Sequence, residues 1–329
     1  MATKPVAEFQ APEGSLLKLI TKMDNVPLDF EVNHDSYYRL ILSPDTRAHG
    51  FIHHKTVQRM PWPSAFTIDD AAHTVTLSTP TAALANAAIQ AAVDAAINGK
   101  QFPTLNGMHS EHFIIPGARY PDSATEGPIK VERFAASLFG IGTRGAHLTA
   151  YVKRPEDGGI SIWVARRSKN IFTYPGMLDS TVAGGVKASD TPLDCILAES
   201  DEEARLAASF VGPRVRHTGV VTLANRNPRT ELFHGEILYV YDLDLSGVDT
   251  RPELGDDGEV EEFLLLDWQE VLRRMLAGEF KPNVCPIMID FFVRHGLVTP
   301  ENEGRYVEIC SRLRRRLPMP TNPENGTDS

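Results

Sequence analysis

The chain lacks long hydrophobic runs, has few cysteines and carries no excess of positive charge. No apolar stretch approaches the roughly 18 residues that a membrane-spanning helix needs. The three cysteines are odd in number and lie in apolar segments, which favours reduced core thiols over a disulfide framework. The net charge of −10 argues against a general nucleic-acid binder and against a polybasic membrane-binding surface.

The first residues also lack the features of a targeting segment. The string MATKPVAEFQAPEG contains neither an apolar signal core nor an arginine-rich amphipathic pattern. We therefore expect a cytoplasmic protein that has neither nucleic acid nor a membrane as a partner. The sequence leaves the oligomeric state open.

What the chain does have is an ordinary globular composition and a length that suits two domains. It contains 329 residues, of which 42% are hydrophobic and 23% charged. Proline, glycine and serine gather at residues 120–129, which favours a boundary there. We expect an N-terminal α+β domain over residues 1–128, a second domain with C-terminal helices over residues 129–317, and a disordered tail over residues 318–329.

Residue patterning predicts the main elements of both domains. In the first domain we expect a helix over 15–25 capped by Ser15, a hairpin over 66–69 and 74–77, and an alanine-rich helix from 81 that Gly99 ends. In the second we expect a hairpin over 146–152 and 160–165, strands over 215–223, 232–245 and 262–267, and helices over 268–277, 284–295 and 301–317.

The chemistry is concentrated in residues 182–206, between the second hairpin and the later strands. A loop of small residues leads to the sequence Asp190-Thr191-Pro192, and Asp194 follows. Thr191 suits the N-cap of a helix, Pro192 suits its first position, and Asp194 completes a sequence close to a capping box. The pattern therefore predicts a short helix that begins at Pro192.

That helix carries three glutamates close together. Residues three and four apart share a face of a helix, so Glu199 is expected beside Glu202 and Glu203. Carboxylates packed this closely repel one another unless a cation or water separates them. Hard oxygen ligands suit Mg²⁺ or Mn²⁺, with phosphate oxygens completing the shell.

This arrangement resembles the Nudix hydrolase family. The family's box has a glycine, five residues, a glutamate, seven residues, Arg-Glu, an apolar residue, any residue, and Glu-Glu. The corresponding positions here hold Gly184, Asp190, Ala198-Glu199 and Glu202-Glu203. Residues 163–185 and the strings EILYVYDLDL and FKPNVCPIMIDFFVRHG further resemble the branch related to thiamine pyrophosphokinase, whose members carry an extra N-terminal domain. The resemblance implies a Nudix α/β/α sandwich with a mixed sheet, preceded by a small α+β domain.

The same resemblance implies an enzyme that uses Mg²⁺ (or Mn²⁺) and a small-molecule diphosphate as its partner. The branch is associated with hydrolysis of thiamine diphosphate, and of its oxidised or damaged analogues, to the monophosphates. Glu199, Glu203 and Glu202 are then the expected metal ligands and catalytic acids. Gly184 and Gly185 would let the main chain come close to metal or substrate.

Two arginines and several acids are candidates outside the box. Arg166 and Arg167 end the strand that leads toward the glycine loop, where an arginine could bind substrate phosphate. Strand alternation turns them to opposite faces, so only one is expected to point inward. Nudix enzymes often take an additional acid from outside the box, and the candidates here are Glu259, Glu261 and Glu262 in an acidic turn and Glu236 in its strand.

Ala198 leaves alternatives open. In the family this position holds an arginine that orients a catalytic glutamate, and one such contact can be worth about 1–3 kcal/mol. Arg205 or Arg167 could substitute for it. The protein could instead be a catalytically weakened diphosphate-binding or regulatory protein, or a hydrolase of another organic diphosphate such as a nucleotide or prenyl species.

Overall fold

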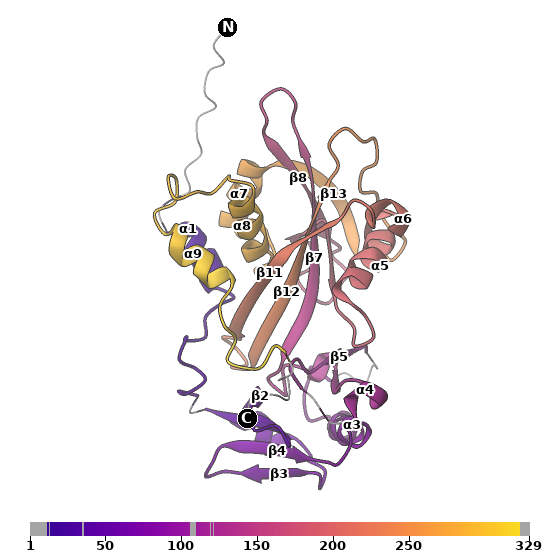
Figure 1. The fold of residues 1–329 in the computed structure, drawn as a ribbon, viewed down its shortest axis with the longest axis vertical. Helices are drawn as coiled ribbons and strands as arrows, with labels where there is room; N and C mark the ends of the chain where they lie inside the picture. Colours follow the sequence, from indigo (N-terminus) through magenta and orange to yellow (C-terminus); the bar gives the residue numbers. More distant parts are fainter. Residues whose placement is uncertain are drawn as a thin grey trace.

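The computed structural model describes residues 12, 14–34, 36–105, 110–118, 120 and 122–322. Within these ranges the protein is a mixed α+β structure with a seven-stranded mixed sheet, a four-stranded sheet and a two-stranded ladder (Figure 1). The expected fold class is confirmed. None of the helices in the described ranges combines the length and the apolar composition that a bilayer crossing requires.

The N-terminal region is built around its own hydrophobic cluster, in which the alanine-rich helix packs against the four-stranded sheet of order β2-β1-β4-β3. The expected hairpin and the alanine-rich helix are both present. The elements are β1 (Tyr37–Ser43), β2 (Ala48–His53), α2 (His54–Arg59), β3 (Phe66–Asp69), β4 (Thr74–Ser78), α3 (Ala82–Asn98), β5 (His112–Ile114), α4 (Ser123–Glu126), β6 (Lys130–Glu132) and the 3₁₀ helix η1 (Arg133–Ala135).

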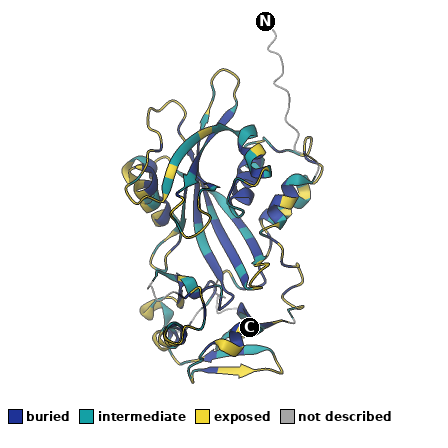
Figure 2. Cartoon of the chain, turned by 180° about the vertical axis from the view of Figure 1, so that it is seen from behind, coloured by how far each residue is buried: buried dark blue, intermediate teal, exposed yellow. Residues whose placement is uncertain are grey.

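The larger region is an α/β/α sandwich. Its sheet has the order β11-β12-β7-β8-β13, with α5 and α6 on one face and α7 and α8 on the other (Figure 1). Figure 2 shows that the central strands are mostly buried between these layers. The elements are β7 (Gly142–Lys153), β8 (Ile160–Arg167), β9 (Leu178–Asp179), β10 (Val182–Gly185), α5 (Pro192–Ala204), α6 (Ala208–Val211), β11 (Arg216–Arg226), β12 (Phe233–Asp244), β13 (Val260–Asp267), α7 (Trp268–Leu276), α8 (Val284–Arg294) and α9 (Tyr306–Leu313).

The sheet divides between β7 and β8. These strands form the expected antiparallel hairpin, but they pair only where residues 151–153 of β7 meet residues 160–162 of β8. Lower on β7, residues 145–148 pair instead with β10, while β9 pairs with β8. The two short strands therefore occupy the space that opens between the long ones, and they bring residues 178–185 into the middle of the sandwich.

Both ends of the N-terminal region pack differently from expectation. Helix α1 (Ser15–Thr21) joins the cluster of α8 and α9 in the larger region, and its N-cap is Gly14, without a side-chain cap, rather than Ser15. After the boundary expected at residue 128, Val131 and Phe139 are still buried in the N-terminal cluster. The apolar packing therefore divides the chain just before β7.

The C-terminal segment is also more ordered than expected. Helix α9 ends at Leu313 and not at residue 317, because the chain after it leaves the helical path to follow β11. Pro318 and Met319 are buried, so the tail expected to be disordered from residue 318 does not begin there. The Met319 sulfur fills the space beside Gly142 and Gly235, where apolar contact offsets the loss of chain entropy. The rest of that tail, residues 323–329, lies outside the described residues.

Candidate functional site

Helix α5 begins where the capping sequence predicts. The Thr191 hydroxyl accepts a hydrogen bond from the Asp194 amide at 3.2 Å, and the Thr191 amide donates to the Asp194 carboxylate at 3.0 Å. Pro192 is the first helical residue. This reciprocal cap fixes the start of the helix, and with it the direction in which each later glutamate points.

The three glutamates of α5 differ in their exposure. Glu203 is 6% exposed, Glu199 is half-buried and Glu202 is exposed. The 3.6-residue period accounts for the difference, because Glu203 shares the sheet-facing side with Ser200, whereas Glu202 is turned about 100° from it. Spacing alone correctly made the three residues neighbours, but it did not show which of them would face the sheet.

The two inner glutamates contact the glycine loop of β10. A Glu203 carboxylate oxygen accepts from the Ala183 amide at 3.4 Å. A Cβ atom placed on Gly184 would lie 2.4 Å from Glu199 Oε1, so only glycine leaves room for that carboxylate. Gly184 is therefore required by the packing of Glu199 itself.

Without a bound cation, the ionised forms of Glu199 and Glu203 are unfavourable. Burial, with the charges of Glu202 and Glu259, raises the pKa of Glu199 to about 7. Burial, with the charges of Glu199 and Asp179, raises the pKa of Glu203 well above its ordinary value. The exposed Glu259 thus acts on both residues although it lies in the loop before β13. A cation bound among these carboxylates would relieve the repulsion.

The donor set fits a hard divalent cation, although it does not form a complete metal site. Across the described ranges, no group of three or more histidine, cysteine or acidic side chains is arranged to hold a metal ion. Glu199 and Glu203 offer carboxylate oxygens, and the loop at Gly184 lies directly against one of them. The remaining oxygens of a Mg²⁺ or Mn²⁺ shell would have to come from water or from substrate phosphate, as is usual for Mg²⁺.

A second buried carboxylate, Asp179 on β9, was not identified from the sequence. It accepts from Arg167 at 2.9 Å and from Lys281 at 3.3 Å. Burial alone would raise the pKa of Asp179, but the charges of Lys281 and Arg167 hold it below its usual value. The charge of Asp179 in turn raises the pKa of Glu203, so this ion-pair centre adjoins the box acids.

The two predicted arginines do point to different environments. Arg166 pairs with the half-exposed Glu262 at 2.5 Å, and Arg167 pairs with the buried Asp179. The alternation expected from the strand is therefore observed, and Arg167 is the one that faces inward. Its guanidinium also donates to the Thr173 carbonyl, which fixes its position next to Asp179.

Neither arginine suggested as a substitute for the box arginine lies against Glu199. Ala198 is exposed, Arg205 pairs with Asp256 at 2.5 Å, and Arg167 is held by Asp179. The cation whose charge lowers the pKa of Glu199 is instead Lys187, in the loop after β10. No spacing rule points to this lysine, because its position depends on how the loop folds back.

The N-terminal region packs directly onto the same loop. The Ala188 amide donates to the His112 carbonyl at 2.7 Å, and Lys187 pairs with Glu111 at 3.1 Å. A Cβ atom on Gly185 would lie 2.8 Å from the Phe113 ring, so this glycine is required by an aromatic side chain of the other region. Residues 111–113 thus form one wall of the loop that carries the box glycines.

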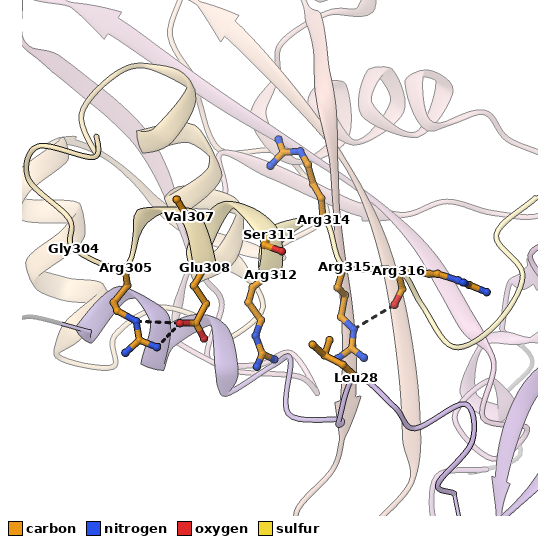
Figure 3. A pocket seen from close by; sticks show the side chains of 10 residues that line it. All are labelled: Leu28, Gly304, Arg305, Val307, Glu308, Ser311, Arg312, Arg314, Arg315 and Arg316. Atoms are coloured by element: carbon orange, nitrogen blue, oxygen red, sulfur yellow. Dashed lines mark hydrogen bonds and ion pairs between the residues drawn. The ribbon is translucent and has the colours of Figure 1, made fainter.

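A groove of about 730 Å³ lies along α9, away from these acids (Figure 3). It is rich in arginine, but Arg312 and Arg315 pair with the buried Asp24, and Arg305 pairs with Glu308. Asp24 also accepts from the Ala224 amide of β11 at 3.1 Å. Through Asp24, Arg312 and Arg315 connect the segments around α1 and α9 to the sheet. Because these arginines are paired within the chain, the groove is not the candidate site.

Comparison with known proteins places the box residues in a recognised domain. The NUDIX domain family matches residues 144–284. A Saccharomyces cerevisiae protein with the name Uncharacterized protein YJR142W is 32% identical over 326 residues, which cover 93% of this chain and 92% of the yeast protein. Nudix hydrolase 20, chloroplastic, of Arabidopsis thaliana is 36% identical over 210 residues, which cover 62% of this chain and only 54% of the plant protein. Among solved structures, DR0079 from Deinococcus radiodurans is 21% identical over 45% of this chain and 82% of that chain, with a TM-score of 0.35.

The matched domain begins in β7 and ends at the first residue of α8, so it contains the glycine loop, all three glutamates of α5 and both ion-pair partners of Asp179. The full-length similarity to the yeast protein extends the relationship to the N-terminal region. The chain therefore contains a NUDIX domain over residues 144–284 and, with Nudix hydrolases among its relatives, is a hydrolase that acts on pyrophosphate bonds.

Proposed function

We propose that this protein is a Mg²⁺- or Mn²⁺-dependent hydrolase that cleaves thiamine diphosphate, or its oxidised or damaged analogues, to the monophosphate and phosphate. The observation that carries the metal and diphosphate part is the Glu199–Glu203 pair, half-buried and buried respectively, which lies against the glycine loop with raised pKa values. The thiamine part is supported by the resemblance of residues 163–185 and of the two later segments to the thiamine-pyrophosphokinase-related branch. The cytoplasmic location stays a prediction.

Each residue has a defined task in this proposal. Glu199 and Glu203, with Glu202, would hold the metal, which would supply positive charge beside the phosphate oxygens and lower the pKa of the attacking water. One carboxylate of this group accepts the proton of that water as general base. Water adds to the terminal phosphorus, the bridging P–O bond breaks, and the organic monophosphate leaves with the bridging oxygen.

The remaining predicted residues support the phosphates. Arg167 lies with Lys281 at Asp179, beside Glu203, and either cation can donate to a phosphate oxygen that approaches the pair. Arg166 is a weaker candidate because it is paired with Glu262. Gly184 and Gly185 keep the loop free of side chains, and Glu259 is the candidate acid from outside the box.

A phosphate-release assay tests the proposal. The protein is incubated with thiamine diphosphate, an oxidised analogue, a nucleoside diphosphate and a prenyl diphosphate, with and without Mg²⁺. We expect Mg²⁺-dependent release from the thiamine compounds, and a fall in kcat of roughly 10²- to 10³-fold in Glu203→Gln. Glu270→Gln, a surface carboxylate of α7 that pairs with arginines, is the matched control and should keep the wild-type rate. Release that persists unchanged in Glu203→Gln would overturn the assigned site, and no release from any substrate would overturn the function.

Ala198 favours a second candidate, a diphosphate-binding protein with weak turnover. The side chain at this position is exposed, so an arginine fits there without disturbing the core. If the missing arginine limits the rate, Ala198→Arg should raise kcat by about tenfold, the value of one orienting contact. Tight diphosphate binding by calorimetry with negligible phosphate release would support this candidate. A high wild-type rate that the substitution leaves unchanged would exclude it.

A further inference from the structure

A cluster of polar side chains lies where β12 and β7 meet the start of α8. Asn283 donates to Glu236 Oε1 at 3.1 Å, and His234 Nε2 lies 3.9 Å from the same oxygen. The other neighbour of His234 Nε2 is the Thr143 hydroxyl, at 3.2 Å. We call these four residues, Thr143, His234, Glu236 and Asn283, the strand-end cluster.

Three polar atoms of the strand-end cluster are buried without a hydrogen-bond partner among the described residues. They are Glu236 Oε2, His234 Nδ1 and Asn283 Oδ1. Glu236 is only 8% exposed, so its free oxygen has lost water and gained nothing in return. A buried polar atom without a partner is unfavourable, and water, an ion or a ligand usually satisfies it, so three such atoms in one place indicate a position for another molecule.

The strand-end cluster lies on different elements from the box acids. Glu236 is on β12 and Asn283 precedes α8, whereas Glu199 and Glu203 are on α5. Tyr174 lies near enough to Glu236 for its pKa to be raised by the Glu236 charge as well as by burial.

The sheet register places the strand-end cluster at a distance from the box that one substrate molecule can span. Glu236 is opposite Thr143 on one side of β7, and Gly185 is opposite Gly145 on the other side. Two strand spacings and two residue rises put the Cα atoms of Glu236 and Gly185 about 12 Å apart. An extended molecule with a diphosphate at one end and a ring at the other can span that distance.

The Asp179–Lys281 ion pair relates the two sites through the chain. Lys281 is two residues before Asn283 of the strand-end cluster, and the charge of Asp179, its partner, raises the pKa of Glu203 in the box.

The unpartnered atoms of the strand-end cluster determine which hydrogen-bonding groups a bound ring must carry. A carboxylate oxygen and an amide oxygen accept hydrogen bonds only, so the matching groups on a ligand are N–H donors. A carboxylate also favours positive charge and binds an amino group next to a protonated ring nitrogen with two parallel bonds. Tyr174 is 41% exposed beside Glu236, which leaves part of an aromatic side chain open to a planar ring.

We propose that the strand-end cluster is the specificity subsite of this hydrolase and that it binds an amino-substituted, basic or cationic heterocycle at the organic end of the diphosphate substrate. This inference rests on the proposed function for the position of the diphosphate. Glu236 and Asn283 accept from the ring's N–H groups, and His234 completes the contact as donor or acceptor. A prenyl diphosphate has no donor for these atoms and is selected against.

Substrate competition tests the subsite. kcat/KM is measured for thiamine diphosphate, which carries an aminopyrimidine and a cationic ring, and for dimethylallyl diphosphate, which carries neither. We expect Glu236→Gln to lower the ratio of the two values at least tenfold. Asn283→Ala should lower it in the same direction, and its fold is secure because Asn283 makes no side-chain cap bond to α8. Glu270→Gln should leave the ratio unchanged. An unchanged ratio in both cluster variants would overturn the inference.

A binding measurement separates this inference from the proposed function. Thiamine monophosphate is titrated into metal-free protein by calorimetry, so no hydrolysis is involved. Binding to the wild type that is at least tenfold weaker in Glu236→Gln supports the subsite, even if no diphosphate is hydrolysed. Equal binding to the wild type and to both cluster variants, or no binding to the wild type, would overturn the subsite while leaving the hydrolase assignment to the phosphate-release assay.

Discussion

Asp179 and Glu203 are both buried carboxylates, and the charge of Asp179 raises the pKa of Glu203, yet their pKa values shift in opposite directions. Asp179 has Arg167 and Lys281 within 3.3 Å, and its pKa is lowered. Glu203 accepts from the Ala183 amide but is repelled by Glu199, and burial with this repulsion raises its pKa. Burial is common to both, so the difference comes from the presence or absence of an adjacent cation.

The comparison separates a carboxylate whose charge is balanced by neighbouring cations from one whose charge is not. The charge of Asp179 is balanced by Arg167 and Lys281 of the same chain, as is usual for a buried charge. The Glu199–Glu203 pair is incomplete, and it becomes favourable only when a cation is supplied from outside. The same reasoning applies to the pairing of Asp24 with Arg312 and Arg315, which we call the Asp24 junction and whose charges are balanced within the chain. The strand-end cluster differs, because three of its polar atoms have no partner among the described residues.

Substitution of Asp179 should give the largest effect. Asp179→Asn leaves Arg167 and Lys281 without their counter-charge, so we expect the free energy of unfolding to fall by about 3–5 kcal/mol. Glu203→Gln removes a repelled charge and should leave the metal-free protein equally or more stable. Urea unfolding of both variants at pH 7 measures the difference. Equal losses of stability in the two would show that both carboxylates are held by the chain alone.

The pH dependence of stability should show the same difference between a carboxylate with a raised pKa and one with a lowered pKa. Glu199 has an ordinary pKa of 4.5 that rises to about 7 in the folded protein, so between these values the unfolded state binds fewer protons. Stability of the metal-free protein should therefore fall as pH rises through this window, by up to roughly 3 kcal/mol. The lowered pKa of Asp179 acts in the opposite sense and only at acid pH, where its contribution is lost as pH falls.

Thermal unfolding in a chelating buffer between about pH 5 and pH 8 checks this expectation. Glu199→Gln should flatten the decline, and added Mg²⁺ should raise the melting temperature most at the alkaline end, where the acids are charged. A decline that is identical in Glu199→Gln, or a Mg²⁺ effect that does not grow with pH, would contradict the raised pKa.

The contact between Gly184 and Glu199 provides a steric test. In Gly184→Ala the new Cβ atom would meet Glu199 Oε1 at 2.4 Å, so the carboxylate must move. We expect kcat to fall by about tenfold to a hundredfold, because displacement of a reacting group by about 1 Å can have an effect of that size. Gly304→Ala is the matched control, since that glycine has no atom within 4 Å of its Cβ position. Equal rates in the two variants would show that Glu199 need not stay where it lies.

The smallest effect is expected in the acidic loop. Glu259 is exposed but its charge acts on Glu199 and Glu203, whereas Glu261 pairs with Lys169. Glu259→Gln should lower phosphate release by about threefold to tenfold if it contributes an outer ligand. Glu261→Gln, two residues away, should have no effect. The reverse order would assign the additional acid to Glu261.

The parts of the site that follow local rules were predictable from the sequence. The capping box at Thr191 and Asp194 sets the start of α5 by contacts within four residues. The spacing from that cap then makes Glu199 and Glu203 neighbours, and the alternation of β8 turns Arg166 and Arg167 to opposite sides. None of these features depends on distant parts of the chain.

The parts that depend on long-range packing were not predictable. Asp179 and Lys281 are far apart in the sequence and meet because β9 occupies the opening between β7 and β8. Lys187 approaches Glu199 only because residues 111–113 hold its loop from the N-terminal region. An acidic or basic residue in a loop has no periodicity, so its partners become evident only in the folded structure.

The Asp24 junction constrains the order in which the chain can fold during synthesis. Asp24 is synthesised 288 and 291 residues before its partners Arg312 and Arg315. Until these arginines are made, Asp24 could be buried against β11 only without a counter-charge, so the larger region cannot reach its final state before then. The final packing of this region therefore waits for the synthesis of residues 312–315.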